Sequence, residues 1–139
     1  MSHEIKRFGV SLEADLQQRF DRHMRNHHYT NRSEAIRDLI RRALVEDEWS
    51  GEGDVIGSIT LVYDHHVSDL TQRLTAMQHD HVHEIITSMH VHLDHHNCLE
   101  VLIVRGPGKR IADLAARMRS ERGVKHATLS MTSTGAELS

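Results

Sequence analysis

Metal-binding side chains gather in one segment of this chain. Seven of the 14 histidines lie within the 18 residues 79–96, and the chain's one cysteine, Cys98, follows two residues later. Imidazole nitrogen and thiolate sulfur are the side-chain donors that borderline and soft transition metals prefer. The segment therefore predicts a site for Ni(II), Cu(II) or Zn(II). Square-planar coordination would favour nickel or copper, and a closed tetrahedron would favour zinc.

The spacing within this segment suggests which side chains meet. His90 and His92 are two residues apart in a predicted strand, so both imidazoles leave the same face. Cys98 begins the next strand after a short turn at 94–97, so its sulfur can approach that face. His79 lies at the end of a predicted helix and can reach the same metal or the equivalent metal of a neighbouring chain. Any one histidine alone would more often fill a polar strand face, but the combination favours a metal site.

A hydrolase motif overlaps the same residues. The string His90-Val91-His92-Leu93-Asp94-His95 matches the H-x-H-x-D-H pattern of metallo-β-lactamase-like hydrolases. That fold needs a longer chain and further downstream ligands, whereas His126 is the only histidine after Cys98. The string also spans a strand and its turn, not a strand-to-helix loop. We therefore expect no enzymatic activity.

The segment after residue 50 predicts the domain that carries these ligands. Alternating and β-branched residues indicate strands, and apolar residues at helical spacing indicate helices. The strands are expected at 55–63, 84–93, 98–104 and 124–131, and the helices at 67–77 and 111–118. The order β-α-β-β-α-β predicts a ferredoxin-like (ACT-like) fold, which makes the whole chain α+β.

The first fifty residues predict a smaller unit that needs a second copy. Residues 7–12 alternate as a half-buried strand, and two amphipathic helices follow, the second capped by Asn31 or Ser33. A single strand leaves its hydrogen-bonding edge unpaired, and two short helices make a thin core. Pairing two copies gives an antiparallel ribbon that fits the DNA major groove. The outward residues of that ribbon are Arg7, Gly9 and Ser11.

Composition limits the remaining classes. The chain has 139 residues, enough for one ordinary domain or two small ones, and the acidic segment 47–54 suggests a linker between domains 1–50 and 51–139. A net charge of −3 excludes a bulk polycation, although up to Arg42 nine Lys or Arg residues face six Asp or Glu residues. Because the sequence contains no long apolar run, we expect no transmembrane helix, and we also expect no signal peptide. A single cysteine suggests a reducing compartment. We expect a cytoplasmic protein without membrane contact.

Several segments of the sequence resemble those of known families. RFGVSL (7–12) and YTNRSEAIRDLIRRAL (29–44) resemble a ribbon-helix-helix DNA-binding domain. With Gln78-His79, SMHVHLDHHNCLE (88–100) and RGVKHATLSMTSTG (122–135), nearly the full chain resembles the NikR-type nickel-responsive transcriptional regulators. The resemblance implies a repressor that binds one Ni(II) per subunit in a square-planar site. The implied ligands are His90, His92 and Cys98 of one subunit and His79 of another.

The resemblance also implies partners and further site residues. It implies a homotetramer, a dimer of dimers, on an inverted-repeat operator in double-stranded DNA, with Arg7, Gly9 and Ser11 as base-reading positions. Glu34 and Asp38 fit a family cation site between the domains, and Gln78 and Glu100 fit a second layer around the ligands. The other histidines of the segment and its neighbourhood are expected to be mostly solvated surface that binds extra metal weakly: His65, His66, His81, His83, His95 and His96.

Other functions stay open at this point. A copper- or zinc-responsive regulator would use the same donors. A metal-storage or metal-delivery protein would need the histidine-rich module alone, and would not bind an operator. A sensor of small molecules such as amino acids would bind DNA in response to that molecule, whether or not a metal ion is present.

Overall fold

The computed structural model describes residues 4–138 and contains two compact units. The chain passes from one unit to the other between Leu44 and Val45. Among residues 4–138, no helix combines the length and the apolar character that crossing a membrane requires.

The first unit contains two helices, α1 (Ala14–Asn26) and the larger part of α2 (Arg32–Ser50). Asn31 caps α2, because its side-chain oxygen accepts a hydrogen bond from the backbone N of Glu34 at 2.9 Å. Residues 4–13 adopt no regular secondary structure, although a strand is expected at 7–12. A strand needs a hydrogen-bonded partner strand, and one chain by itself supplies none here.

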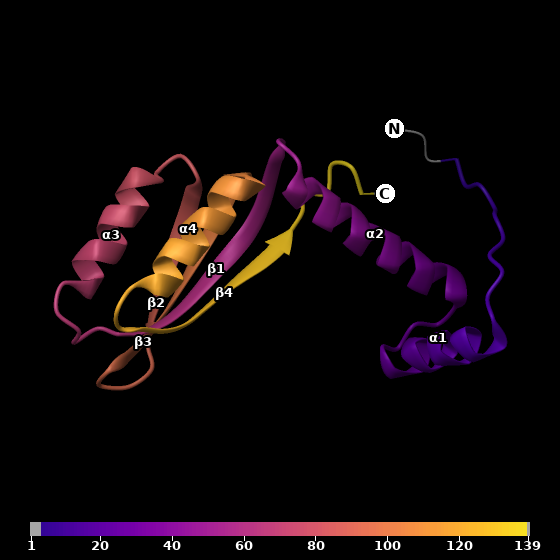
Figure 1. The fold of residues 1–139 in the computed structure, drawn as a ribbon, viewed down its shortest axis with the longest axis horizontal. Coiled ribbons are helices and arrows are strands. Elements are labelled where there is room, and N and C mark those ends of the chain that lie inside the picture. Colours follow the sequence, from indigo (N-terminus) through magenta and orange to yellow (C-terminus); the bar gives the residue numbers. More distant parts are fainter. Residues whose placement is uncertain (1–3, 139) are drawn as a thin grey trace. The chain divides into compact units, whose positions relative to one another are not determined.

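The second unit is a four-stranded antiparallel sheet with two helices (Figure 1). The strand order is β2-β3-β1-β4, and the order of elements along the chain is β-α-β-β-α-β, which confirms the predicted fold class. The elements are β1 (Asp54–Asp64), α3 (Leu70–Asp80), β2 (Ile85–His92), β3 (Asn97–Pro107), α4 (Gly108–Ser120) and β4 (Val124–Thr132).

One face of this sheet carries the core, and the two helices cover it (Figure 1). Alternate residues of β1 and β3 are buried, as the period of two in their sequences requires. They pack with residues of α3 and α4 such as Leu74, Ile111 and Leu114. On the other face, Met89 and Val91 of β2 are exposed by 64% and 42%. The second unit therefore leaves apolar side chains of this open face uncovered.

Residues 47–54 differ from the expected linker, because a tryptophan in them is buried. α2 continues to Ser50, and Trp49 is only 6% exposed. Its indole Nε1 donates a hydrogen bond to the Thr132 carbonyl at 2.8 Å. A Cβ on Gly108 would lie 2.5 Å from the Trp49 carbonyl oxygen, so only glycine allows this approach. Val45 to Ser50 therefore belong to the second unit and fix the last turns of α2 onto it.

The turn between β2 and β3 is built by one carboxylate. Asp94 Oδ1 accepts hydrogen bonds from the backbone N of His96 and of Asn97, both at 2.8 Å. Its Oδ2 accepts a third from Asn97 Nδ2 at 2.9 Å. The side-chain bond from Asn97 and the two backbone bonds lower the pKa of Asp94 to about 2. An aspartate that bonds backbone groups two residues ahead is the usual side chain for such a turn.

Replacing Gly108 by alanine is expected to disturb the packing around Trp49. The added methyl group collides with backbone, so we expect the free energy of unfolding to fall by about 1–3 kcal/mol. Urea unfolding followed by fluorescence measures this directly, because Trp49 is the only tryptophan of the chain. Gly53→Ala is the matched control, since a Cβ there meets nothing within 4 Å. Equal unfolding midpoints for the two variants would contradict the packing described here.

The turn at Asp94 is expected to keep its order in moderate acid. Because the folded pKa of Asp94 lies below its ordinary value of 3.8, its contribution to stability is complete above that value. It is lost as the pH falls through about 2. The amide NMR shifts of His96 and Asn97 should therefore stay constant down to about pH 3. In Asp94→Asn this acid step should be absent, and a step near pH 4 in the parent would refute the prediction.

Candidate metal centre and DNA-binding surface

Three metal-binding side chains meet at one end of the sheet. The ligand atoms of His65, His92 and Cys98 all lie within 4.8 Å of one another. His65 Nδ1 is 3.2 Å from Cys98 Sγ, and His92 Nδ1 is 3.3 Å from it. Cys98 is buried, His65 is half-buried and His92 is exposed. Two imidazoles and one thiolate around a common point fit a borderline transition metal.

The sheet register puts two of these ligands together. His92 of β2 is paired with Cys98 of β3, which is in turn paired with Tyr63 of β1. Paired residues of neighbouring antiparallel strands project to the same face. The turn built by Asp94 brings the chain back within a few residues, so His92 and Cys98 end on the same side. The predicted proximity of these two side chains is therefore present in the structure.

His65 is the member of this cluster that the sequence interpretation missed. It was expected among the solvated surface histidines, whereas it follows β1 directly and contacts Cys98. Its backbone N donates a hydrogen bond to the His96 carbonyl at 3.0 Å, which extends the pairing of β1 with β3 beyond the strand ends. The available signal was the predicted fold: in this topology the end of the first strand lies beside the start of the third.

Burial controls the proton of the thiol. Removal from water raises the pKa of Cys98, and the negative charges of Asp94 and Glu100 raise it further. The metal-free chain therefore holds Cys98 as a neutral thiol at neutral pH. A metal ion that binds the sulfur has to displace this proton.

His90 belongs to a hydrogen-bonded network next to the three ligands. Its Nε2 lies 3.3 Å from Oε1 of Glu100, and its Nδ1 lies 3.4 Å from the Tyr63 hydroxyl. Glu100 is only 2% exposed and also accepts hydrogen bonds from Gln78 Nε2 at 2.8 Å and from the Tyr63 hydroxyl at 3.3 Å. Burial, followed by the charge of Glu100, raises the pKa of Tyr63, which keeps its hydroxyl protonated as a donor. A buried carboxylate is stable here because each of its oxygens has a partner.

His79 lies apart from this cluster within the single chain. It is exposed in the last turn of α3, and it takes no part in the contacts around Cys98. Its neighbour Gln78 points to Glu100, and successive residues of a helix project about 100° apart. The chain by itself thus joins His92 and Cys98, holds His90 beside them, and leaves His79 facing outward.

The other histidines of the region divide into two groups. His81 is buried and its Nδ1 is 2.9 Å from the Met77 carbonyl, so it is a structural residue at the end of α3, not solvated surface. Exposed positions hold the remaining four, as expected: His66, His83, His95 and His96.

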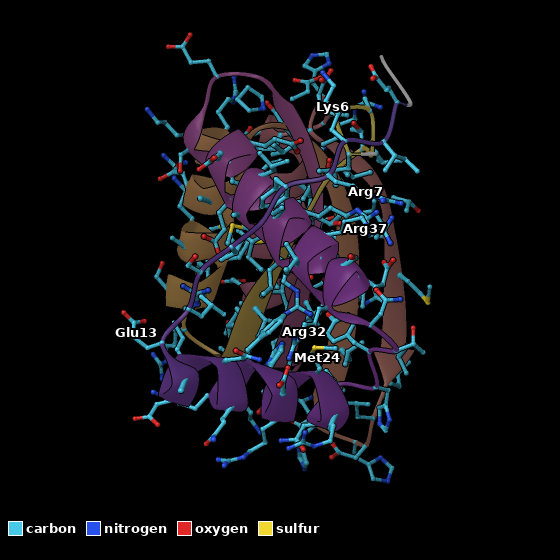
Figure 2. The ribbon with its side chains drawn as sticks, turned by 90° about the vertical axis from the view of Figure 1, so that its right-hand side faces the viewer. Lys6, Arg7, Glu13, Met24, Arg32 and Arg37 are labelled. Atoms are coloured by element: carbon cyan, nitrogen blue, oxygen red, sulfur yellow. The ribbon has the colours of Figure 1, made fainter. Side chains whose placement is uncertain are left out.

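The first unit presents an apolar hollow with basic side chains around it. The hollow measures about 1040 Å³ and lies between residues 5–12 and the two helices. Phe8, Val10 and Leu12 line it and are exposed by 73%, 61% and 41%, and no residue of α1 is buried. Four basic residues line it as well, and Figure 2 shows their side chains: Lys6, Arg7, Arg32 and Arg37.

The candidate DNA-binding and cation-binding residues are all exposed or engaged locally. Arg7, Gly9 and Ser11 are exposed. Glu34 forms ion pairs with Arg37 at 2.8 Å and with Arg41 at 3.6 Å. Asp38 accepts a short hydrogen bond from the Tyr29 hydroxyl and pairs with Arg42 at 3.2 Å. The Tyr29 bond lowers the pKa of Asp38.

Family models match both units of the chain. The model of the NikR C terminal nickel binding domain matches residues 56–132. The model of the ribbon-helix-helix protein, copG family, matches residues 6–47. The first model describes a nickel-binding domain and the second a ribbon-helix-helix protein, and neither description is that of an enzyme.

Relatives match over almost the whole chain. A protein of Nitratidesulfovibrio vulgaris, nickel-responsive regulator by name, is 57% identical over 95% of this chain and 96% of its own length. A protein of the same name from Geobacter metallireducens is 52% identical over 97% and 98%. Among solved structures, an uncharacterized protein from Thermotoga maritima covers 56% of this chain and 96% of its own, with a TM-score of 0.51 and 11% identity, a likeness of fold alone. The chain belongs to the family of NikR-type nickel-responsive regulators, with a ribbon-helix-helix region before a nickel-binding domain.

Proposed function

We propose that this protein is a repressor that binds one Ni(II) per subunit and, when loaded, holds an inverted-repeat operator as a homotetramer. The observation that carries the proposal is the meeting of Cys98, His92 and His65 in a chain whose other unit is a DNA-binding domain. We assign the DNA-binding role to residues 1–50, of which the last six pack with the second unit, and the nickel-binding and tetramerisation role to residues 51–139. Such a regulator works in the cytoplasm, where the DNA is.

The proposed ligands of the loaded site are His90, His92 and Cys98 of one subunit and His79 of another, in a square-planar arrangement. His92 and Cys98 are already adjacent, and His90 is two residues away on the same strand face. Glu100 accepts from His90 Nε2, which orients the ring and leaves Nδ1 for the metal once the contact with Tyr63 opens. Gln78 fixes Glu100 in turn.

The fourth ligand comes from a neighbouring copy in this proposal. An exposed His79 at the end of α3 is suited to donate outward. The uncovered apolar face of the sheet gives two copies a reason to associate, because burying exposed side chains such as Met89 and Val91 is favourable. His65 then serves as a partner of the thiol in the metal-free chain.

The proposed DNA contact is a ribbon of two paired segments. The strand of a second copy can fill the apolar hollow of the first unit with Phe8, Val10 and Leu12. The alternate residues Arg7, Gly9 and Ser11 then face the major groove. Glu34 and Asp38 keep a proposed role as a cation site, for which their arginine partners would have to move.

Mixing two inactive variants tests the shared site. Cys98→Ser lacks the thiolate and His79→Ala lacks the outer ligand, so each protein alone should lose tight nickel binding and the thiolate-to-nickel absorption band. In mixed assemblies, His79 of the Cys98→Ser chain can complete the site of the His79→Ala chain. We expect the band to return to a fraction of the parental intensity after the two proteins are unfolded and refolded together.

Two results would contradict the ligand assignment. If Cys98→Ser binds nickel with the affinity and spectrum of the parent, the thiol is not a ligand. The second result combines two samples: the mixture shows no thiolate-to-nickel band, and the single variant His65→Ala lacks the band that the parent shows. The metal would then be held by the cluster of His65, His92 and Cys98 within one chain. An equal response to Cu(II) or Zn(II) in operator binding would reassign the metal but keep the regulator.

Substitution of Arg7 tests the ribbon. Arg7→Lys keeps the charge but loses the two-pronged hydrogen bonding of the guanidinium to a base edge. In the presence of nickel we expect the preference for the operator over random DNA to fall by about 1–3 kcal/mol, with little change in salt dependence. Gel-shift titrations at several salt concentrations measure both quantities. Parental specificity in Arg7→Lys, or specific binding that is equal with and without nickel, would refute the proposed mechanism.

A further inference from the structure

Two histidines at the end of α1 form a pair outside the site already described. His23 and His27 are four residues apart, so they project from the same side of the helix. Their rings stack with centroids 4.1 Å apart. His23 is half-buried and His27 is exposed, so solvent has access to the pair. All the residues of this feature lie within the first unit.

The pair contains an unsatisfied nitrogen. Nε2 of His23 is buried and has no hydrogen-bond partner, and it is the only buried side-chain nitrogen or oxygen of that kind in residues 4–138. A buried polar atom without a partner costs free energy, so its presence in a native fold calls for a partner of some kind. A ligand that binds the nitrogen lone pair would supply one.

The second ring is oriented as a metal ligand would be. Nδ1 of His27 is 2.9 Å from the His23 carbonyl oxygen, and it must carry the proton to donate this hydrogen bond. The tautomer leaves Nε2 of His27 with a free lone pair. Histidines that bind metals usually donate their other ring nitrogen to a carbonyl or carboxylate in this way. The two stacked rings therefore each have an Nε2 to which the structure gives no hydrogen-bond partner within the described residues.

The pair is connected to the second helix of the unit through one tyrosine. Tyr29 stacks on His23 with centroids 6.1 Å apart, and its hydroxyl donates to Asp38 of α2. A ligand that fixes the two histidine rings therefore also stabilises the turn between α1 and α2. That turn precedes Asn31, which caps α2.

We propose that His23 and His27 form a second, weaker site for a borderline divalent metal ion, bound by the two Nε2 atoms, that fastens the turn between α1 and α2. Neutral imidazoles at this spacing suit Ni(II), Cu(II) or Zn(II), with water completing the coordination. The exposed ring of His27 has to turn slightly out of the stack so that both nitrogens reach the ion. The site uses no residue of the Cys98 cluster.

Nickel itself is the probe for the test. The full chain is first given one equivalent of Ni(II) and then titrated further, while NMR records the line widths of the histidine Hε1 and tyrosine ring protons. Six-coordinate Ni(II) is paramagnetic and broadens signals near it. We expect the broadening beyond one equivalent to begin at His23, His27 and Tyr29. The thermal unfolding midpoint should rise over the same range.

Two variants separate this site from surface binding. His27→Gln keeps a polar side chain but removes one ligand, so the apparent affinity of the second ion should fall by about tenfold or more. The matched control is His28→Asn: His28 is exposed and has a φ of 62°, a conformation that asparagine tolerates. It should bind the second ion as the parent does.

The alternatives give different results. Broadening spread evenly over the exposed histidines, or equal losses in His27→Gln and His28→Asn, would refute the site. So would an absence of broadening at His23 and His27 in the parent, whether or not the variants fold. The absorption band of the Cys98 site is read in the same samples. Its loss would refute the proposed nickel ligands and leave the result for His23 and His27 standing.

Discussion

The antiparallel register of β3 between β1 and β2 is the constraint on which the metal centre depends. It pairs Cys98 with both His92 and Tyr63, and Glu100 with His90. Because side chains alternate along a strand, a slip of one residue would turn Cys98 and Glu100 to the open face and separate them from their partners. The three hydrogen bonds that Asp94 accepts fix the length of the turn and so exclude that slip.

Burial gives this centre a defined metal-free state. Cys98 remains a thiol because its surroundings are dry and carry negative charge, and Glu100 remains satisfied because Tyr63, Gln78 and His90 surround it. These contacts hold the side chains in place before any metal arrives, which reduces the ordering that binding has to supply. Metal binding has to work against this arrangement, because the thiol of Cys98 must lose its proton when its sulfur binds a metal.

Much of the second unit could be predicted from the sequence, because alternation and helical spacing are local signals. The hairpin that brings His92 to Cys98 is likewise local. Placing His65 beside Cys98 requires the strand order. That order is set by contacts between distant segments, so local signals do not reveal it. Trp49 was missed because an acidic, glycine-containing stretch resembles a linker, while its burial depends on the small size of Gly57 and Gly108. The expected strand at 7–12 depends on a second chain, which no single-chain structure contains.

Both units leave apolar surface uncovered in the single chain. The first exposes Phe8 and Val10 around a hollow, and the second exposes Met89 and Val91 on the open face of its sheet. Two separate uncovered surfaces allow a chain to pair with one copy through each of them, as the proposed dimer of dimers requires. In the proposed assembly the contact that completes the nickel site also joins two DNA-reading ribbons. Nickel and DNA would then each favour the same assembled state, and each would strengthen the binding of the other by the same factor.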